Sequence, residues 1–325
     1  MKNEQIIMKT VFGSKLYGLD NNKSDSDYIG IYLPTLDELL LNTYKPYVFN
    51  NTDKGKNNEN SVDEQFIALP TFIKLCCKNE TVALDVLHST VAEYDCTGNG
   101  AIWVSLQNNR HKFLTKNMKA HIGFISGQVK RFNRKGEKLK VIRDLIVLLK
   151  TFNPESRLSE NWDELPTGKY IEKGVFDHNT KFTNNSKYWD IFGSKYQENI
   201  TIKYCIEQLQ LREHSYGKRT KKTEVTDYID YKSVSHGFRV AYQLLDLYTK
   251  GYFTYPLAQT EFLKDVKGAK YNYHTELADK LEGLIQEIFS VAKTTDYPEK
   301  VDSEYWDNWL LDVYKLELID NKEMI

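Results

Sequence analysis

Two segments decide the fold of this chain: FGSKLYG at residues 12–18 and SDSDYIGIY at residues 24–32. The residues before the first segment, 5–12, are apolar and rich in β-branched side chains, which predicts a strand. Gly13 and Ser14 then interrupt this strand with a residue that tolerates any backbone angle and a small hydroxyl donor. A strand that ends in Gly-Ser before a short helix leaves outward-pointing N–H groups, which suit a phosphate.

The second segment carries a pair of acidic residues. Residues 25–33 are typical of another strand, and the two-residue period of a strand places Asp25 and Asp27 on one face. Two carboxylates this close repel each other unless a cation lies between them, and oxygen ligands suit Mg²⁺ or Mn²⁺. A phosphate-binding turn followed by Asp-x-Asp on a strand is what metal-assisted nucleotidyl transfer requires.

The spacing of these motifs resembles a known family. Gly13-Ser14, ten intervening residues and then Asp25-Ser26-Asp27 resemble the nucleotidyltransferase motif of the DNA polymerase β superfamily. The fuller pattern, GSKLYG with SDSDY and GIY, resembles a bacterial and phage branch of predicted nucleotidyltransferases. The resemblance implies two Mg²⁺ (or Mn²⁺) ions and transfer of a nucleoside monophosphate from an NTP, such as ATP, to an acceptor hydroxyl, with release of pyrophosphate.

A third carboxylate is expected on the strand predicted at residues 61–69. Asp63 and Glu64 both qualify by chemistry, and they lie on opposite faces of that strand. The run ALPTF at residues 68–72 matches the helix start that follows the acidic residue in relatives, which favours Asp63 and leaves Glu64 as the alternative. Asp85 is a further acidic residue that we expect to be structural.

The resemblance also implies which residues bind the nucleotide. It assigns Gly13 and Ser14 to the β- and γ-phosphates, and Lys15 is close enough along the chain to add positive charge. Two motifs of the second half, YGKR at residues 216–219 and Lys-x-x-x-His-x-x-Arg at residues 232–239, match motifs of relatives. The remaining nucleotide-binding candidates are Tyr17, Lys218, Arg219, Lys232, His236 and Arg239.

The helix predicted at residues 230–251 has two stripes of side chains. One stripe is apolar, and the other contains Lys232, His236 and Arg239 at the same four- and three-residue steps. Because a merely solvated face does not require a histidine flanked by two cations, we predict that this polar stripe faces the catalytic cleft.

Composition limits the remaining function classes. The 44 Lys and Arg nearly balance the 45 Asp and Glu, so any basic site is local, as at residues 218–222. No alternation of aromatic and basic residues along the sequence marks an RNA platform, so the acceptor stays open among RNA (such as a tRNA end), protein or a small molecule. A catalytically lapsed nucleotide-binding or regulatory protein and a metal-dependent phosphohydrolase are the alternative functions.

Further expectations concern organisation and location. No run of eighteen apolar residues occurs, the first residues lack the apolar core of a signal peptide, and the four cysteines have no metal-ligand spacing. We therefore expect a reduced protein of a bacterial or phage-infected cytoplasm that does not bind membranes. The predicted fold class is α+β, with a small mixed-sheet nucleotidyltransferase core at residues 1–118 and a mainly helical, substrate-binding domain at residues 119–325.

Overall fold

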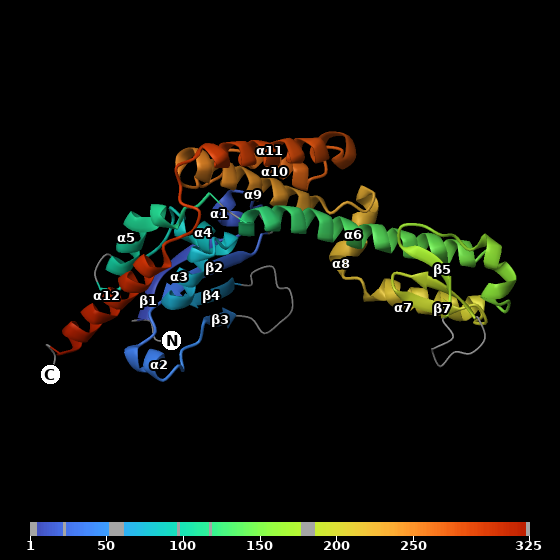
Figure 1. Cartoon of the computed structure of the whole chain (residues 1–325), viewed down its shortest axis with the longest axis horizontal. Helices are drawn as coiled ribbons and strands as arrows, with labels where there is room; N and C mark the ends of the chain where they lie inside the picture. The colour runs from blue at the N-terminus through green and yellow to red at the C-terminus, as the bar shows by residue number, and fades with distance from the viewer. Residues whose placement is uncertain are drawn as a thin grey trace. The chain divides into compact units, whose positions relative to one another are not determined.

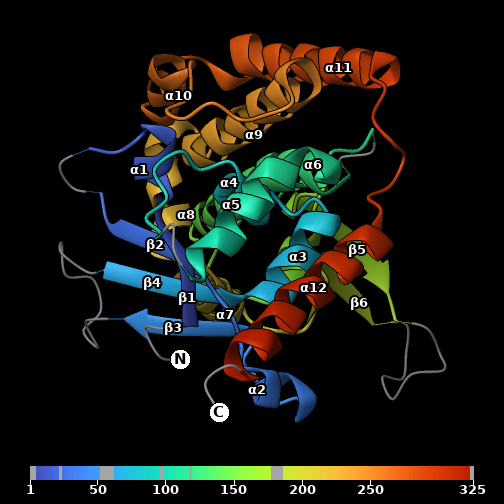
Figure 2. The same cartoon turned by 90° about the vertical axis from the view of Figure 1, so that its left-hand side faces the viewer.

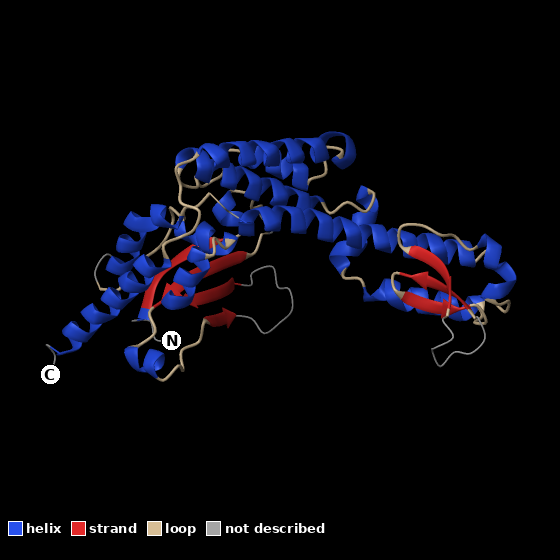
Figure 3. Cartoon of the chain, in the orientation of Figure 1, coloured by secondary structure: helices blue, strands red, loops and turns tan. Residues whose placement is uncertain are grey.

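The computed structural model describes residues 5–21, 24–51, 62–95, 98–116, 119–176 and 186–322. The chain forms two compact units. We call residues 1–128 and 231–325 the terminal unit, and residues 129–230 the central unit. Both units combine strands with helices (Figure 3), which confirms the predicted α+β class.

The terminal unit contains a four-stranded mixed sheet with the order β1-β2-β4-β3. β2 is antiparallel to β1 and parallel to β4, and β3 is antiparallel to β4. The strands are β1 (Ile6–Phe12), β2 (Ser26–Tyr32), β3 (Tyr47–Asn51) and β4 (Val62–Ala68). The sequence predicts β1, β2 and β4 but not β3, and most of the polar loop expected at residues 50–60 lies outside the described residues. Because β2 and β4 run parallel, both begin at the same edge of the sheet.

Close packing in this sheet depends on one glycine. Gly30 of β2 pairs with Phe66 of β4, and a Cβ at Gly30 would lie 2.4 Å from the Phe66 ring. The ring therefore crosses the sheet where Gly30 has no side chain. Phe66 packs there with Tyr32 and Ala68 in a small buried cluster.

Helices complete the terminal unit, and α9, α10 and α11 lie together in it (Figure 2). Their bounds are α1 (Ser14–Tyr17), α2 (Leu36–Leu40), α3 (Leu69–Cys77), α4 (Thr81–Leu87), α5 (Gly100–Asn109), α9 (Tyr231–Lys250), α10 (Thr260–Lys267), α11 (Ala278–Thr294) and α12 (Ser303–Lys322). No helix within the described ranges is both long and apolar enough to cross a membrane.

Helix α9 is buried on more than one side. The predicted apolar stripe is largely confirmed, because Val234, Phe238 and Ala241 are inaccessible to solvent. Polar side chains of the same helix, including Arg239 and Gln243, are buried as well. α9 is therefore an internal helix of the terminal unit rather than a surface helix with one wet face.

The structure divides the chain differently from the sequence prediction. The predicted boundary at residue 118 would place residues 119–325 in one domain, whereas residues 231–325 group with the N-terminal part of the chain. The physical reason is that Arg239 and Gln243 of α9 donate hydrogen bonds to the buried carboxylate of Asp85 on α4. The chain therefore leaves the terminal unit after residue 128 and returns to it at Tyr231.

The central unit packs helices against a three-stranded antiparallel sheet with the order β5-β6-β7 (Figure 1). The boundary between the units falls within α6. The elements are α6 (Lys119–Leu149), β5 (Ile171–Val175), β6 (Lys187–Ile191), β7 (Ser194–Gln197), α7 (Ile202–Ser215) and α8 (Lys218–Lys222). The core of the unit includes Ile142 and Leu149 of α6, Trp189 of β6, and Cys205 and Leu209 of α7.

Two sequence expectations concern the elements of this unit. Residues 153–185 have no clear period, which predicts an irregular segment, but they contain β5. The spacing of apolar residues predicts helix at residues 119–133 and 136–150, and the structure joins the two stretches in the single helix α6. Gly136 does not break this helix, because it permits close packing: a Cβ there would lie 2.1 Å from the carbonyl oxygen of Tyr228.

Two histidines are buried in the terminal unit. His88 and His121 are 2% and 1% exposed, and both rings contact Phe253. Burial lowers the pKa of His88 to about 3 and that of His121 to about 4. Both imidazoles are therefore neutral in the folded protein at neutral pH.

We expect the free energy of unfolding to fall as the pH drops from 7 to 5. The unfolded histidines bind protons near pH 6.5, whereas the folded ones stay neutral until about pH 4, so protons favour the unfolded chain across this range. Urea denaturation at pH 7 and pH 5 measures this difference. The difference in unfolding free energy between the two pH values should be smaller in His121→Asn than in the wild type. It should be unchanged in the control His214→Asn, which replaces an exposed histidine of α7. Equal stability of the wild type at both pH values would contradict the burial of neutral imidazoles.

Candidate functional site

The turn between β1 and α1 requires a glycine. Gly13 has φ 65° and ψ −139°, in the region that L side chains rarely adopt. A Cβ at this position would lie 2.8 Å from Oδ2 of Asp27. The absence of a side chain at Gly13 therefore lets the Asp27 carboxylate approach the backbone of the turn.

Three acidic residues lie near the edge where β2 and β4 begin. Asp27 of β2 pairs in parallel register with Asp63 of β4, and Asp25 precedes Asp27 by two residues. Burial raises the pKa of Asp27, and the negative charges of Asp63 and Asp25 raise it further. Lys232 and Lys15 oppose this increase. The raised pKa indicates that negative charge at this edge is not fully balanced by the protein itself.

Asp63 and Glu64 lie on opposite faces of the sheet, and the register shows which of them is on the side of Asp27. Glu64 pairs with Tyr28, one position further along both strands, and its side chain lies on the other face of the sheet. There it forms an ion pair with Lys9 of β1, whose ammonium lies 4.4 Å from the centre of the Tyr28 ring. Asp63, not Glu64, is therefore the third acidic residue beside Asp25 and Asp27.

A cavity of about 420 Å³ opens beside Asp25 and Asp27. Its other wall comes from α9 and from the last residue of α10. The predicted residues that line it are Gly13, Ser14, Tyr17, Asp25, Asp27, Lys232 and His236. Lys15 is exposed and donates a hydrogen bond to the Ser26 hydroxyl, and its charge still acts on Asp27.

Lys267 also lines the cavity, although the sequence analysis does not single it out. Burial lowers the pKa of Lys267, and the neighbouring charge of Lys232 lowers it further. Two ammonium groups therefore crowd one wall while carboxylates crowd the other. No local pattern links Lys267 to Lys232, because the two lysines lie on separate helices that meet only in the fold.

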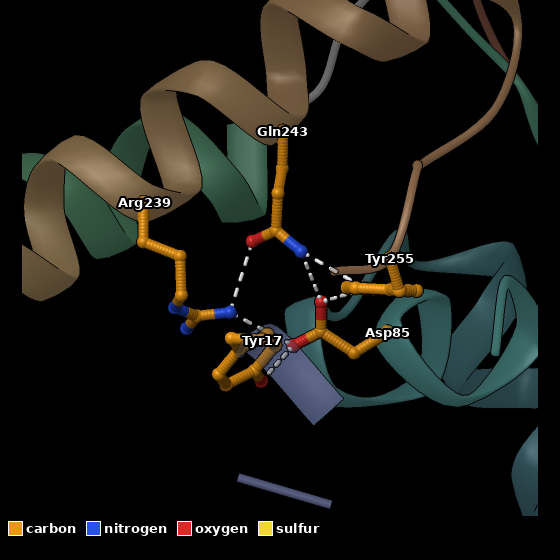
Figure 4. Close-up of polar contacts among 5 residues, drawn as sticks. All are labelled: Tyr17, Asp85, Arg239, Gln243 and Tyr255. Carbon is orange, nitrogen blue, oxygen red and sulfur yellow. Dashed lines mark hydrogen bonds and ion pairs between the residues drawn. The ribbon is translucent and has the colours of Figure 1, made fainter. Parts of the chain in front are cut away.

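Arg239 does not face this cavity, so the prediction for the third member of the polar stripe is wrong. Arg239 is 5% exposed, and its Nη1 atom lies 3.1 Å from Oδ2 of Asp85 (Figure 4). Its guanidinium group lies 4.0 Å from the centre of the Tyr17 ring. The physical reason is that α9 borders the cavity at Lys232 and His236 and then enters the interior.

Asp85 is the centre of a buried polar cluster. It is 2% exposed and accepts hydrogen bonds from the hydroxyls of Tyr17 (2.6 Å) and Tyr255 (2.8 Å) and from Nε2 of Gln243 (2.6 Å), besides Arg239 (Figure 4). Burial raises the pKa of both tyrosines, and the Asp85 charge raises it further. Tyr17 therefore lines the cavity while its hydroxyl is held by Asp85. The expectation that Asp85 is structural agrees with this arrangement.

The basic motif of the second half belongs to the other unit. Lys218 lies on α8 of the central unit, and the side chain of Arg219 lies outside the described residues. The lining residues of the cavity all belong to the terminal unit. Their predicted role in nucleotide binding stays a prediction.

The donor set of the site suits a divalent cation together with a phosphate. Among the described residues, no three His, Cys, Asp or Glu side chains are already arranged as a metal site. Mg²⁺ is usually held by one or two carboxylates, with water and substrate phosphates as the other ligands. The crowded carboxylates at Asp27 fit this mode of binding, in which a nucleotide completes the site.

Comparisons with known proteins identify a relative. No family model matches the chain, and no solved structure matches it significantly. The chain is 30% identical over 328 aligned residues to a protein of Enterobacteria phage T4, described as "Uncharacterized 38.9 kDa protein in nrdC-mobD intergenic region". The alignment covers 95% of this chain and 96% of that protein, so the similarity extends over both units.

Replacing Arg239 with methionine should destabilise the fold by about 3–5 kcal/mol, because it leaves the buried Asp85 carboxylate without its cation. The matched variant Lys232→Met removes a cation of the same helix that is exposed, and it should change stability by no more than about 0.5 kcal/mol. Urea denaturation of both variants at pH 7 measures the contrast. Equal effects would contradict the assignment of Arg239 to the interior.

Asp27→Asn should raise the melting temperature at pH 7. A carboxyl whose folded pKa lies above the unfolded value of 3.8 binds protons more tightly in the folded state, so its ionisation destabilises the fold as the pH rises through this window. The gain should therefore disappear below pH 3.8. Thermal unfolding across pH, with the exposed Asp312→Asn as control, provides the test. A lower melting temperature for Asp27→Asn at pH 7 would show that its charge is favourably bound.

Proposed function

The chain belongs to the family of this phage T4 protein, whose description names no activity, and we propose from the candidate site that it is a metal-dependent nucleotidyltransferase. The reaction is transfer of a nucleoside monophosphate from an NTP to an acceptor hydroxyl. The acceptor oxygen bonds to the α-phosphorus, the bond from that phosphorus to the bridging oxygen breaks, and pyrophosphate leaves with that oxygen.

One observation carries the proposal: the cavity has carboxylates on one wall and ammonium groups on the other. Asp27 of β2 and Asp25, just before that strand, line one wall of the cavity. Lys232 of α9 and Lys267 of α10 line the other wall. Burial, and then the like charges on each wall, raise the pKa of Asp27 and lower that of Lys267. A polyphosphate with a divalent cation presents both signs of charge, so it relieves the crowding on both walls at once.

The carboxylates of Asp25, Asp27 and Asp63 would hold Mg²⁺ or Mn²⁺. When bound, such ions supply neutralisation of phosphate charge and lower the pKa of the acceptor hydroxyl. Asp63, exposed beside Asp27, is placed to accept the proton that this hydroxyl loses.

Other residues of the cavity position the nucleotide. The Gly13 turn and the Ser14 hydroxyl bind the β- and γ-phosphates in the proposed complex, as the motif resemblance implies. Lys232 and Lys267 attract the same phosphates from the opposite wall, and His236 lies beside Lys232 on that wall. Tyr17, which lines the cavity, is held in a fixed position by Asp85 and Arg239. Positioning and charge neutralisation thus supply most of the rate in this proposal.

Incubation with each α-³²P-labelled NTP, Mg²⁺ and a bacterial lysate should label an acceptor and release pyrophosphate. Asp27→Asn and Asp63→Asn should lower this transfer at least about 100-fold, because each removes a charge that acts where the phosphates react. Glu64→Gln is the matched control: it changes the adjacent acidic residue on the opposite face and should retain transfer. Lys232→Met should weaken NTP binding by about 1.5–3 kcal/mol, the worth of a charged hydrogen bond.

The products separate this proposal from its alternatives. Orthophosphate without labelled acceptor would identify a phosphohydrolase instead. NTP binding without turnover in every lysate fraction would identify a nucleotide-binding protein that has lost catalysis. Loss of transfer in Glu64→Gln, but not in Asp63→Asn, would contradict the assignment of the third carboxylate.

A further inference from the structure

Strand β3 brings a phenylalanine to the face of the sheet that carries the acidic residues of the candidate site. Asn51 of β3 pairs with Asp63 of β4, and Asp63 pairs in turn with Asp27 of β2. Residues two apart on a strand share a face, so the next row on this face contains Phe49 of β3 and its partner Gln65 of β4. Phe49 therefore lies one row along the sheet from Asp63 and one strand beyond it.

The cover over this face ends before β3. Ile29 and Ile31, which lie on the same face of β2, are buried. In contrast, Phe49 is 66% exposed, and Tyr47, the next residue of β3 on this face, is 38% exposed. Within the described ranges, neither ring contacts another ring or a cation. Two aromatic side chains are therefore presented to solvent close to the acidic row.

Gln65 adds a polar group to this surface. Its side chain is half-buried, and no hydrogen bond of its amide is found in the part of the chain that the structure describes. The amide can donate two hydrogen bonds and accept two, and a ligand that supplies partners for it gains affinity. An aromatic ring beside such an amide matches a nucleobase, which has a flat face for stacking and a polar edge.

This surface lies away from the groups assigned to the triphosphate. The sheet order β1-β2-β4-β3 puts β3 at the opposite edge from β1, which leads into the Gly13 turn. The cavity proposed for the triphosphate is lined by residues of that turn, of β2, of α9 and of α10. A group that binds at Phe49 therefore approaches Asp63 from the side of β4 and β3. In the proposed reaction this is the side of the acceptor.

We propose that Phe49, Gln65 and Tyr47 bind the bases at the 3′ end of a single-stranded nucleic acid, which is the acceptor. The proposal rests on the proposed function for the role of Asp63, which receives the proton of the terminal sugar hydroxyl as the hydroxyl oxygen bonds to the α-phosphorus. Phe49 stacks on the terminal base, Gln65 bonds to the edge of that base, and Tyr47 stacks on the base before it. A protein hydroxyl on serine or threonine brings no planar group to Phe49, so the surface favours a nucleic acid.

The test measures binding of 5′-labelled single-stranded hexamers of RNA and of DNA to the full chain, with Mg²⁺ and without NTP. Each hexamer is compared with one whose 3′-terminal nucleotide lacks its base. By fluorescence anisotropy, the wild type should bind the intact RNA or DNA at least about fivefold more tightly than its abasic counterpart, the lower limit for one stacked base. Phe49→Ala should remove this difference, and Gln65→Leu should weaken binding of the intact hexamer about two- to tenfold, as expected for one hydrogen bond.

Phe289→Ala is the matched control, because it removes an exposed phenylalanine of α11, outside the sheet. It should keep the preference of the wild type for the intact hexamer. Phe49→Ala should still bind the abasic hexamer as the wild type does, which shows that the variant is folded. The proposal is overturned if the wild type binds intact and abasic hexamers equally, or if Phe49→Ala behaves like Phe289→Ala.

A nucleobase at Phe49 could also come from the NTP, and a second measurement separates the two sources. The Kd of each NTP with Mg²⁺, measured by calorimetry, should be the same for the wild type and Phe49→Ala. Weaker NTP binding in Phe49→Ala, with no change for the hexamers, would overturn the assignment to the acceptor. A lack of transfer activity, with the preference for the intact hexamer retained, would contradict the proposed function and leave the base-binding surface in place.

Discussion

The buried carboxylate of Asp85 is the constraint on which the geometry of the candidate site depends. A charge that is 2% exposed is stable only if donors surround it, and here Tyr17, Arg239, Gln243 and Tyr255 do so. These donors come from the helix after the Gly-Ser turn, from α9 and from the segment that follows α9. The same cluster that satisfies one buried charge therefore joins the first turn of the chain to residues more than two hundred positions later.

This connection lets one helix serve two roles. Arg239 and Gln243 anchor α9 in the interior, and Lys232 and His236, nearer its start, line the cavity. The charges of the site are not balanced, because burial and then neighbouring like charges raise the pKa of Asp27 and lower that of Lys267. A stable scaffold that holds unfavourable charge in an open cavity is typical of a binding or catalytic site, where the ligand supplies the missing counter-charges.

The parts of the fold that were predictable are those with local signals. The period of two predicts that Asp25 and Asp27 lie together, and both line the cavity although β2 begins only at Ser26. Gly13 marks the turn because few other residues adopt its backbone angles. Periodicity also places Arg239 on the same stripe as Lys232, but it does not tell where along the helix burial begins. Lys267 joins the cavity only because α9 and α10 meet in the fold, so no pattern along the chain reveals it.

The central claim is that the cavity between Asp27 and Lys232 receives a nucleoside triphosphate together with divalent cations. A crystal structure of the chain with Mn²⁺ and a non-hydrolysable NTP analogue tests this claim most directly, because manganese can be located by its anomalous scattering. The account predicts manganese at Asp25, Asp27 and Asp63, with the phosphates between Ser14 and the two lysines. Nucleotide bound instead in the larger cavity of about 590 Å³ lined by Ile102 and Trp309, with no manganese at Asp27, would contradict it.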